Sequence, residues 1–445
     1  MSARRRITTI ASTLGTTFQD FVASSTAGGI IILVFTAVAM LWINSPWSES
    51  YEHLIHAPVN IQLFSLDLKF SFAHFVNDAL MVIFFVAVGL EIKRELLVGE
   101  LSSRKRALLP MIAAVFGMVG PALIYLAFNG GTDAARGWGT PVATDIAFAL
   151  GVLALVGPRV PLGIKVFLAA LAIVDDLLSV LVIALFYSSS LNVEMLMWSG
   201  IVTAILFAGN RLGVYSIKFY VLGGLALWVC VLSSGIHATI AGVVLAMTIP
   251  ARRKLNGPEF FAKARALMDE VLRRPDVDDD EATQMDAVHD LEKLAEGVQT
   301  PLHRIEHALQ PYVAFVIMPI FALVNAGVAI DAALLGGLLS PVSLGIALGL
   351  FIGKQLGITA AVWASVRLGI ADLPQGSTMK QIYGVSLLCG IGFTMALFVA
   401  NLAFLDPAHL NEAKLAILLG STISAIVGSI VLRRSLTAPL PTSAT

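Results

Sequence analysis

The chain has 445 residues, of which 57% are hydrophobic and only 13% are charged, and its formal net charge at pH 7 is -1. A soluble domain carries roughly a quarter charged residues, so this composition, with a mean hydropathy of +0.84, indicates an integral membrane protein. The near-zero net charge excludes a broadly basic protein that binds nucleic acid.

The N-terminal segment, residues 1–25, is polar and begins with three arginines, so it is predicted to be cytoplasmic. The apolar run after it is too late and too long for a secretory signal, and is predicted to be the first membrane helix. Windows of about 20 apolar residues predict about twelve spanning helices, eight within residues 26–250 and four within 306–434.

Two predicted segments lie outside the helical bundle. Residues 59–72 alternate apolar and polar side chains around a turn-like centre, which predicts a small β-hairpin on the outer, periplasmic face. Its edge could pair with a second copy in a homodimer, and an ordinary surface hairpin is the alternative. Residues 251–305 form a charged loop, interpreted as a part-helical solvated spacer, with regulation as the alternative.

Lysine and arginine gather in alternate loops along the whole chain. Because cytoplasmic loops are enriched in these residues, the 251–305 loop, the tail 435–445 and both termini are predicted to be cytoplasmic. The two cysteines, Cys230 and Cys389, lie in apolar runs without metal-ligand spacing, so they are interpreted as packing residues and no cofactor is expected.

Four ionisable residues fall within predicted spans: Asp145, Asp175, Asp176 and Lys354. Each costs about 2.5–3.5 kcal/mol at the membrane centre on insertion scales, so they must face one another or a wet cavity. Two adjacent carboxyl groups in such a place bind protons tightly, or hold a small hard cation through oxygen once they are deprotonated. A buried structural ion-pair network is the alternative.

Two spans are predicted to be broken near these charges. Pro141 interrupts the run 137–151 just before Asp145, and Gly390, Gly392 and Thr394 interrupt the run 389–404. Irregular backbone at membrane depth survives only where it lines a cavity or is buried in protein. Broken helices beside titratable groups indicate a transporter.

Seven stretches in order along the chain resemble the bacterial sodium/proton antiporter A family: GLEIKREL, TPVATDIAFALG, LAALAIVDDLLSVLVIALFY, GIHATIAGV, PIFALVNAGV, GKQLGI and LLCGIGFTMALF. The resemblance implies an all-α polytopic membrane fold built as an inverted repeat, in which the two broken helices cross at mid-membrane.

The resemblance also implies roles for individual residues. By motif, Asp176 resembles the position of the principal ligand of the transported Na+ or Li+. Asp175 resembles the position of a proton carrier that pairs with Lys354. Thr144 and Asp145 resemble the broken-helix residues that complete or balance this site.

A second group resembles the positions tied to pH response and to the cytoplasmic entry: Glu91, Arg94, Glu95, His237, Arg304 and Glu306. Taken by its sequence alone, His237 is interpreted as a hydrogen-bonded structural histidine. The loop before Pro301 is enlarged relative to the family, so the pH set-point is not carried over.

The function implied is a secondary Na+(Li+)/H+ antiporter of the bacterial inner membrane, and not an enzyme. Alternating access, activation by alkaline pH and electrogenic exchange of two protons per Na+ are expected of it. A proton- or sodium-coupled symporter of an organic anion is the alternative, although it would need a cationic pocket and Lys354 is the only central cation. An intramembrane aspartyl protease is disfavoured, because the glycine-rich segment reads GIGF rather than GxGD.

Overall fold

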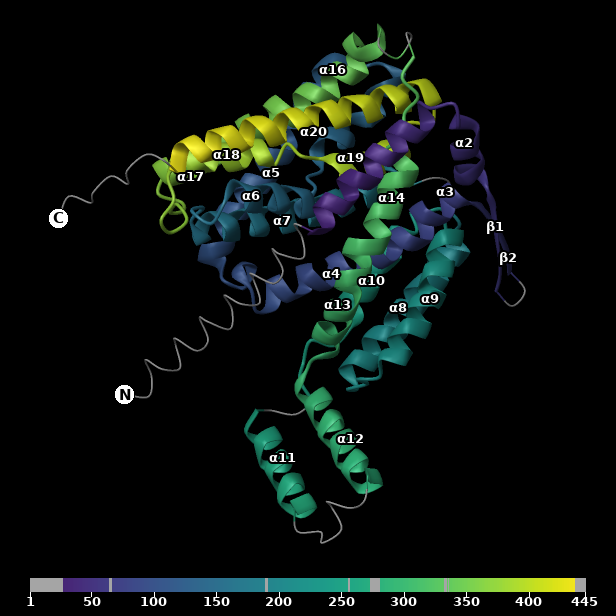
Figure 1. The fold of residues 1–445 in the computed structure, drawn as a ribbon, viewed down its shortest axis with the longest axis vertical. Helices are drawn as coiled ribbons and strands as arrows, with labels where there is room; N and C mark the ends of the chain where they lie inside the picture. The colour runs from purple at the N-terminus through teal and green to yellow at the C-terminus, as the bar shows by residue number, and fades with distance from the viewer. Residues whose placement is uncertain are drawn as a thin grey trace, which may run out of the picture.

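The computed structural model describes residues 27–63, 66–188, 191–254, 257–272, 281–331, 334 and 336–436. The predicted N-terminal segment 1–25 and all but two residues of the predicted tail 435–445 lie outside these ranges. Helices dominate the described residues, and two strands accompany them (Figure 1).

The first half of the chain contains long apolar helices and short 3₁₀- and π-helical segments between them. Its helices are Ala27–Ile43, α2 (Ser48–His56), α3 (Phe72–Phe75), the π-helical η1 (Val76–Leu80), α4 (Met81–Leu97), the 3₁₀-helical η2 (Glu100–Ser102), α5 (Arg104–Asn129), the 3₁₀-helical η3 (Asp133–Val142), α6 (Ile146–Val156), α7 (Leu162–Phe186), α8 (Val193–Arg211), α9 (Ile217–Ser233) and α10 (Thr239–Thr248).

The second half begins with two charged helices and then returns to apolar ones. Its helices are α11 (Gly257–Leu272), α12 (Glu281–Val298), α13 (Pro301–Tyr312), the π-helical η4 (Val313–Ile317), α14 (Met318–Asn325), the 3₁₀-helical η5 (Gly337–Leu339), α16 (Pro341–Leu348), the π-helical η6 (Gly349–Gly353), α17 (Lys354–Arg367), α18 (Met379–Leu388), α19 (Phe393–Ala403) and α20 (Pro407–Leu436).

Within the described residues, seven helices are long and apolar enough to cross a membrane, or up to ten if each of three bent helix pairs is one span. Two of the bent pairs occur where the sequence predicts broken spans: η3 with α6 bends by 43°, and α18 with α19 by 48°. The third, Ala27–Ile43 with α2, bends by 117° and was not expected. These helices are those of an all-α polytopic membrane protein. The count of twelve spanning helices stays a prediction.

The strands β1 (Pro58–Leu63) and β2 (Leu66–Ser71) pair in antiparallel register from Pro58 opposite Ser71 to Leu63 opposite Leu66. They extend from the bundle beside α2 and α3 (Figure 1). At another edge of the molecule, α11 and α12 lie side by side and project beyond the other helices (Figure 1).

The helix α7 lies at the centre of the bundle. It packs against α4, α5, α6, η3 and α18, and 72% of its most apolar window is buried, compared with 17% for α8 at the periphery. A central helix with most of its surface covered by protein is where polar side chains can be tolerated, because their partners come from neighbouring helices.

Small residues let α5 and the start of α17 approach closely. A Cβ atom added at Gly353 would lie 2.6 Å from the Cα of Pro121, and one added at Gly120 would lie 2.5 Å from the carbonyl oxygen of Gly353. Membrane helices pack closely through such residues. The contact fixes the position of Lys354, which directly follows Gly353 at the start of α17.

Candidate functional site

The adjacent aspartates lie in the middle of α7. Asp175 is fully buried and Asp176 is 2% exposed, and the helix continues through both without interruption. Neighbouring side chains on a helix point about 100° apart, so the two carboxylates face different neighbours. One oxygen of each, Oδ1, has no hydrogen-bond partner among the described residues.

The other oxygen of Asp175 contacts the ammonium group of Lys354. The distance from Nζ of Lys354 to Oδ2 of Asp175 is 2.8 Å, and both side chains are fully buried. Lys354 begins α17 immediately after the π-helical turn η6. π-helical turns are rare in proteins, and those that occur are often found at functional sites. This one ends at the residue before Lys354.

The two broken helix pairs are bonded to each other through the residues at their breaks. The backbone N–H of Asp145 donates to the carbonyl oxygen of Ile391 over 2.7 Å. The hydroxyl of Thr144 donates to the carbonyl oxygen of Cys389 over 2.9 Å. Each bond satisfies a backbone group that the interruption of a helix leaves free, which is the condition for irregular backbone at this depth.

Glycine permits this approach. A Cβ atom added at Gly392 would lie 2.9 Å from the carbonyl oxygen of Ala143 and 2.8 Å from Cδ2 of Leu350. Real Cβ atoms do not lie that close to other heavy atoms, so a larger residue would push the two breaks apart. The glycines that predict a broken helix from the sequence also allow the two breaks to meet.

The carboxylate of Asp145 spans both breaks. Asp145 is the N-cap of α6, where its Oδ1 accepts from the backbone N–H of Phe148 over 3.0 Å. Its Oδ2 accepts from the backbone N–H of Thr394 over 3.2 Å, and from the hydroxyl of the same residue. A negative charge at the N-terminal ends of α6 and α19 is favoured by the partial positive charge of each end.

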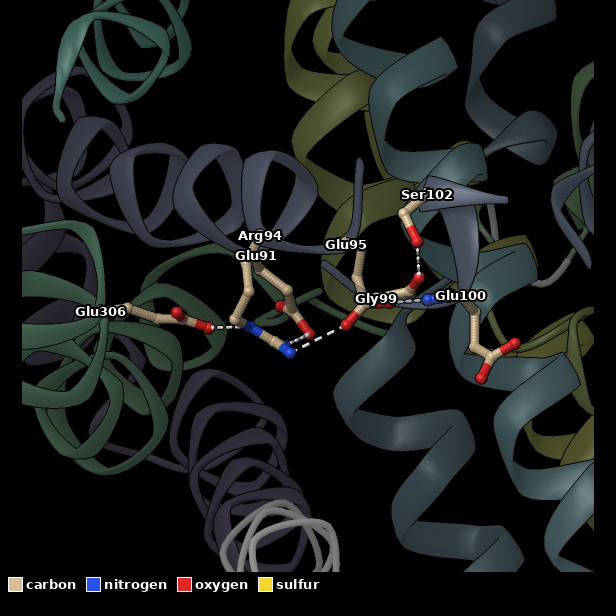
Figure 2. Close-up of polar contacts among 7 residues, drawn as sticks. All are labelled: Glu91, Arg94, Glu95, Gly99, Glu100, Ser102 and Glu306. Carbon is tan, nitrogen blue, oxygen red and sulfur yellow. Dashed lines mark hydrogen bonds and ion pairs between the residues drawn. The ribbon is translucent and has the colours of Figure 1, made fainter. Parts of the chain in front are cut away.

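Arg94, from the second predicted group, lies in the last turn of α4, at the end away from the strands. Three carboxylates surround it (Figure 2). Nε of Arg94 lies 2.9 Å from Oε1 of Glu306, Nη1 lies 2.8 Å from Oε1 of Glu95, and Nη2 lies 4.0 Å from Oε1 of Glu91. Glu306 comes from α13, so the cluster joins α13 to α4. Oε2 of Glu95 also accepts from the backbone N–H of Glu100, which follows the end of α4 (Figure 2).

The structure places two members of that group elsewhere. His237 lies in the connection between α9 and α10, with Nδ1 3.0 Å from the hydroxyl of Thr239 and Nε2 3.6 Å from Oδ1 of Asp78. Burial lowers the pKa of His237 below its ordinary value, and the charge of Asp78 offsets part of that effect. Arg304 lines a cavity of about 410 Å³, whose other lining residues are Gly213, Tyr215, Ser216, Lys254, Gly297, Gln299 and Pro301.

Sequence reasoning missed two hydroxyl side chains close to these charges. Thr394 was recognised only as part of a broken helix, yet it makes two hydrogen bonds to Asp145 from 249 positions away. Ser179, one turn after the aspartates on α7, was not singled out, yet its buried hydroxyl has no hydrogen-bond partner among the described residues. The available signal was a hydroxyl residue at helical spacing from the aspartate pair.

Among the described residues, no group of three or more histidine, cysteine, aspartate or glutamate side chains is placed to hold one metal ion. The buried acidic side chains among the described residues are Asp175 and Asp176 on α7 and Asp145 at the N-terminus of α6. Neither place is a closed chelate made by acidic, histidine or cysteine side chains alone.

Comparison with known proteins gives a consistent result. The family model described as Na+/H+ antiporter 1 matches residues 19–432. A Na(+)/H(+) antiporter NhaA of Oleidesulfovibrio alaskensis is 48% identical over 94% of this chain and 93% of its own length. The proteins of the same name from Caulobacter vibrioides and Vibrio cholerae are 47% and 46% identical, over 93% and 94% of this chain and 90% and 97% of theirs.

Proposed function

The chain belongs to the Na+/H+ antiporter 1 family, and we propose that it exchanges Na+ or Li+ for protons across the bacterial inner membrane. Its relatives are named as antiporters, so it is a transporter and not an enzyme. The observation that carries the proposal is the buried pair of aspartates on α7: each has an oxygen without a hydrogen-bond partner among the described residues, and Asp175 is paired with Lys354.

We assign the transported cation to Asp176 and Asp175, with Thr144 and Asp145 completing or balancing the site. Carboxylate oxygens in a dry environment bind a proton or a small hard cation, and a bare charge there is strongly disfavoured. One cargo must leave before the other enters. This competition couples the two ions, and it also makes the transporter active at alkaline pH, where protons leave.

Lys354 gives the exchange its second proton. In the cation-free state its ammonium is neutralised by Asp175 at 2.8 Å. When a cation occupies the aspartates, the ammonium loses that partner in a buried place, and it is stabilised by giving up a proton. One proton from Asp176 and one from the coupled Asp175–Lys354 pair then exchange for one Na+, so one net positive charge moves inward per cycle. A membrane potential of 100 mV contributes about 2.3 kcal/mol to each such cycle.

The path alternates between the two faces. Bonds between the two breaks, such as that from Asp145 to Ile391, couple any movement of α6 to movement of α19. The cluster around Arg94, with His237 and Arg304 as outlying members, serves the cytoplasmic entry and the response to pH. Loss of the ion pair between Arg94 and Glu306 would weaken the connection from α4 to α13. In a homodimer, the free edge of the paired strands β1 and β2 would pair with the same edge of a second copy.

The competing function, symport of an organic anion, has less support. It needs a cationic pocket, and the ammonium of Lys354 is already neutralised by a carboxylate in contact with it. That arrangement suits a cation as the cargo, since the site presents unpartnered oxygens rather than unpartnered N–H donors.

The test uses the full-length protein in proteoliposomes containing a pH-sensitive dye. Na+ added outside should release protons from the lumen in the wild type. Asp176→Asn should abolish this exchange, whereas the matched control Asp372→Asn, which changes an exposed aspartate, should retain it. Full exchange by Asp176→Asn would remove the site assignment. Absence of exchange in the wild type would refute the proposed function itself.

A further inference from the structure

Several helical hydroxyl groups among the described residues bond to a carbonyl oxygen of their own helix. Thr36, Thr203 and Ser365 each donate to the carbonyl oxygen four residues earlier, at 2.8, 2.7 and 2.8 Å. This is the usual way for a serine or threonine hydroxyl to be satisfied within a helix. Ser179, in the middle of α7, departs from it: the side chain is 3% exposed, and its Oγ has no partner among the described residues.

The neighbours of Ser179 on the helix are the two aspartates. It follows Asp176 by three positions and Asp175 by four, and residues at these spacings share one face of a helix. Helical side chains also lean toward the N-terminus, which directs Ser179 back toward the carboxylates.

Three unpartnered oxygens therefore occupy about one turn of α7: Oδ1 of Asp175, Oδ1 of Asp176 and Oγ of Ser179. In the part of the chain that the structure describes, the other buried side-chain oxygens without a partner belong to different elements, on Asn129, Thr140, Glu306 and Ser424. A buried polar atom without a partner is unfavourable, and a concentration of three calls for a bound species that supplies what all three lack.

The chemistry of the three oxygens selects that species. A proton needs one carboxylate oxygen, whereas a hard metal cation needs several oxygen ligands at once. A serine hydroxyl adds a ligand without adding charge, so it favours the metal ion without attracting a further proton. It thereby changes the balance between the two cargoes in favour of the metal ion.

We propose that Ser179 supplies a hydroxyl ligand to the transported cation, beside the carboxylates of Asp175 and Asp176. The inference rests on the proposed antiport. The larger Na+ takes more oxygen ligands than Li+, so loss of the hydroxyl affects Na+ more. Ser179 thus contributes both to affinity and to the discrimination between the two ions.

Initial rates of exchange in proteoliposomes, measured against Na+ and Li+ concentration at alkaline pH, test this. Loss of one ligand to a charged group should raise the KM of Ser179→Ala for Na+ about tenfold, with a maximal rate within about twofold of the wild type. The KM for Li+ should rise less. Ser179→Thr, which keeps the hydroxyl, should retain a KM for Na+ close to that of the wild type.

Ser365→Ala is the matched control, because Ser365 is also 3% exposed and its hydroxyl bonds only within its own helix. Its KM for both ions should not change. If Ser179→Ala does not purify as a folded protein, Ser179→Cys takes its place, since a thiol is a poor ligand for a hard cation and should raise the KM for Na+.

An unchanged KM for Na+ in Ser179→Ala or Ser179→Cys, or an equal rise for Na+ in Ser365→Ala, would overturn the role of Ser179. Both results leave Na+-dependent proton release by the wild type intact, so they are distinct from failure of the proposed antiport.

Discussion

Replacing Lys354 by methionine tests the central ion pair most directly. The substitution keeps the length of the side chain but removes the charge that lies 2.8 Å from Asp175. Both side chains are fully buried, and Oδ1 of Asp175 has no hydrogen-bond partner among the described residues, so the substitution would remove the counter-ion that these residues supply to the carboxylate. Breaking such a buried pair costs about 3–5 kcal/mol of folding free energy.

The double variant Asp175→Asn/Lys354→Met removes both charges and should recover most of this loss. A cycle of the two single variants and the double variant should give an interaction free energy of about 2–3 kcal/mol, measured by denaturant unfolding in detergent micelles. The exposed Lys380→Met serves as the control and should change stability little.

Transport gives a second measurement on the same variant. If the ammonium of Lys354 participates in carrying the second proton, the dependence of the exchange rate on an imposed membrane potential should differ between Lys354→Met and the wild type. Wild-type voltage dependence in this variant, or additive stability losses in the cycle, would refute the reasoning from the ion pair.

Three further predictions concern the surroundings of the site. Thr394→Val removes the hydroxyl bond to Asp145 and should destabilise the fold by about 1.5–3 kcal/mol in denaturant unfolding, as expected for a hydrogen bond to a charged group; no loss would show that the bond is dispensable. Arg94→Gln leaves the three carboxylates around it without their cation, so the pH profile of exchange should shift; an unchanged profile would exclude the cluster from the pH response. Burial lowers the pKa of His237, so the unfolded chain binds more protons there than the folded one, and the stability contributed by neutral His237 is present above about pH 6.5 and lost as the pH falls below it. Replacing His237 by glutamine should remove this slope in unfolding measured between pH 7 and pH 5, and an unaltered slope would contradict it.

The sequence predicts the local parts of this structure well, for physical reasons that act within a few residues. Long apolar runs predict the spans, and Pro141 and the glycines at 390 and 392 predict the two breaks, because these residues restrict or free the backbone where they stand. Charged residues within spans stand out in the sequence because their insertion into the membrane costs free energy and they are therefore rare there. Each of these signals is written in consecutive residues.

The partners of those residues are not predicted by the same reasoning. The bond from Thr394 to Asp145 joins positions 249 apart, and the pairing of Lys354 with Asp175 came only from the family resemblance. An amide network of Asn77, Asn325 and Asn401 joins η1, α14 and α19 and carried no signal beyond three polar residues in apolar surroundings. Which polar groups meet is decided by helix packing, and helix packing depends on the whole set of contacting surfaces.

Asp145 and Asp176 are equally buried carboxylates that differ in their hydrogen-bond partners. Both side chains are 2% exposed, so burial does not distinguish them. Asp145 accepts hydrogen bonds from two backbone N–H groups and one hydroxyl, which can stabilise its negative charge without any ion. Asp176 has an oxygen with no hydrogen-bond partner in the described part of the chain, so a proton or a cation is needed to stabilise its charge. A carboxylate that is already satisfied suits a permanent link between the two broken helices, whereas one that is not satisfied suits the exchange of one positive partner for another, which the proposed antiport requires.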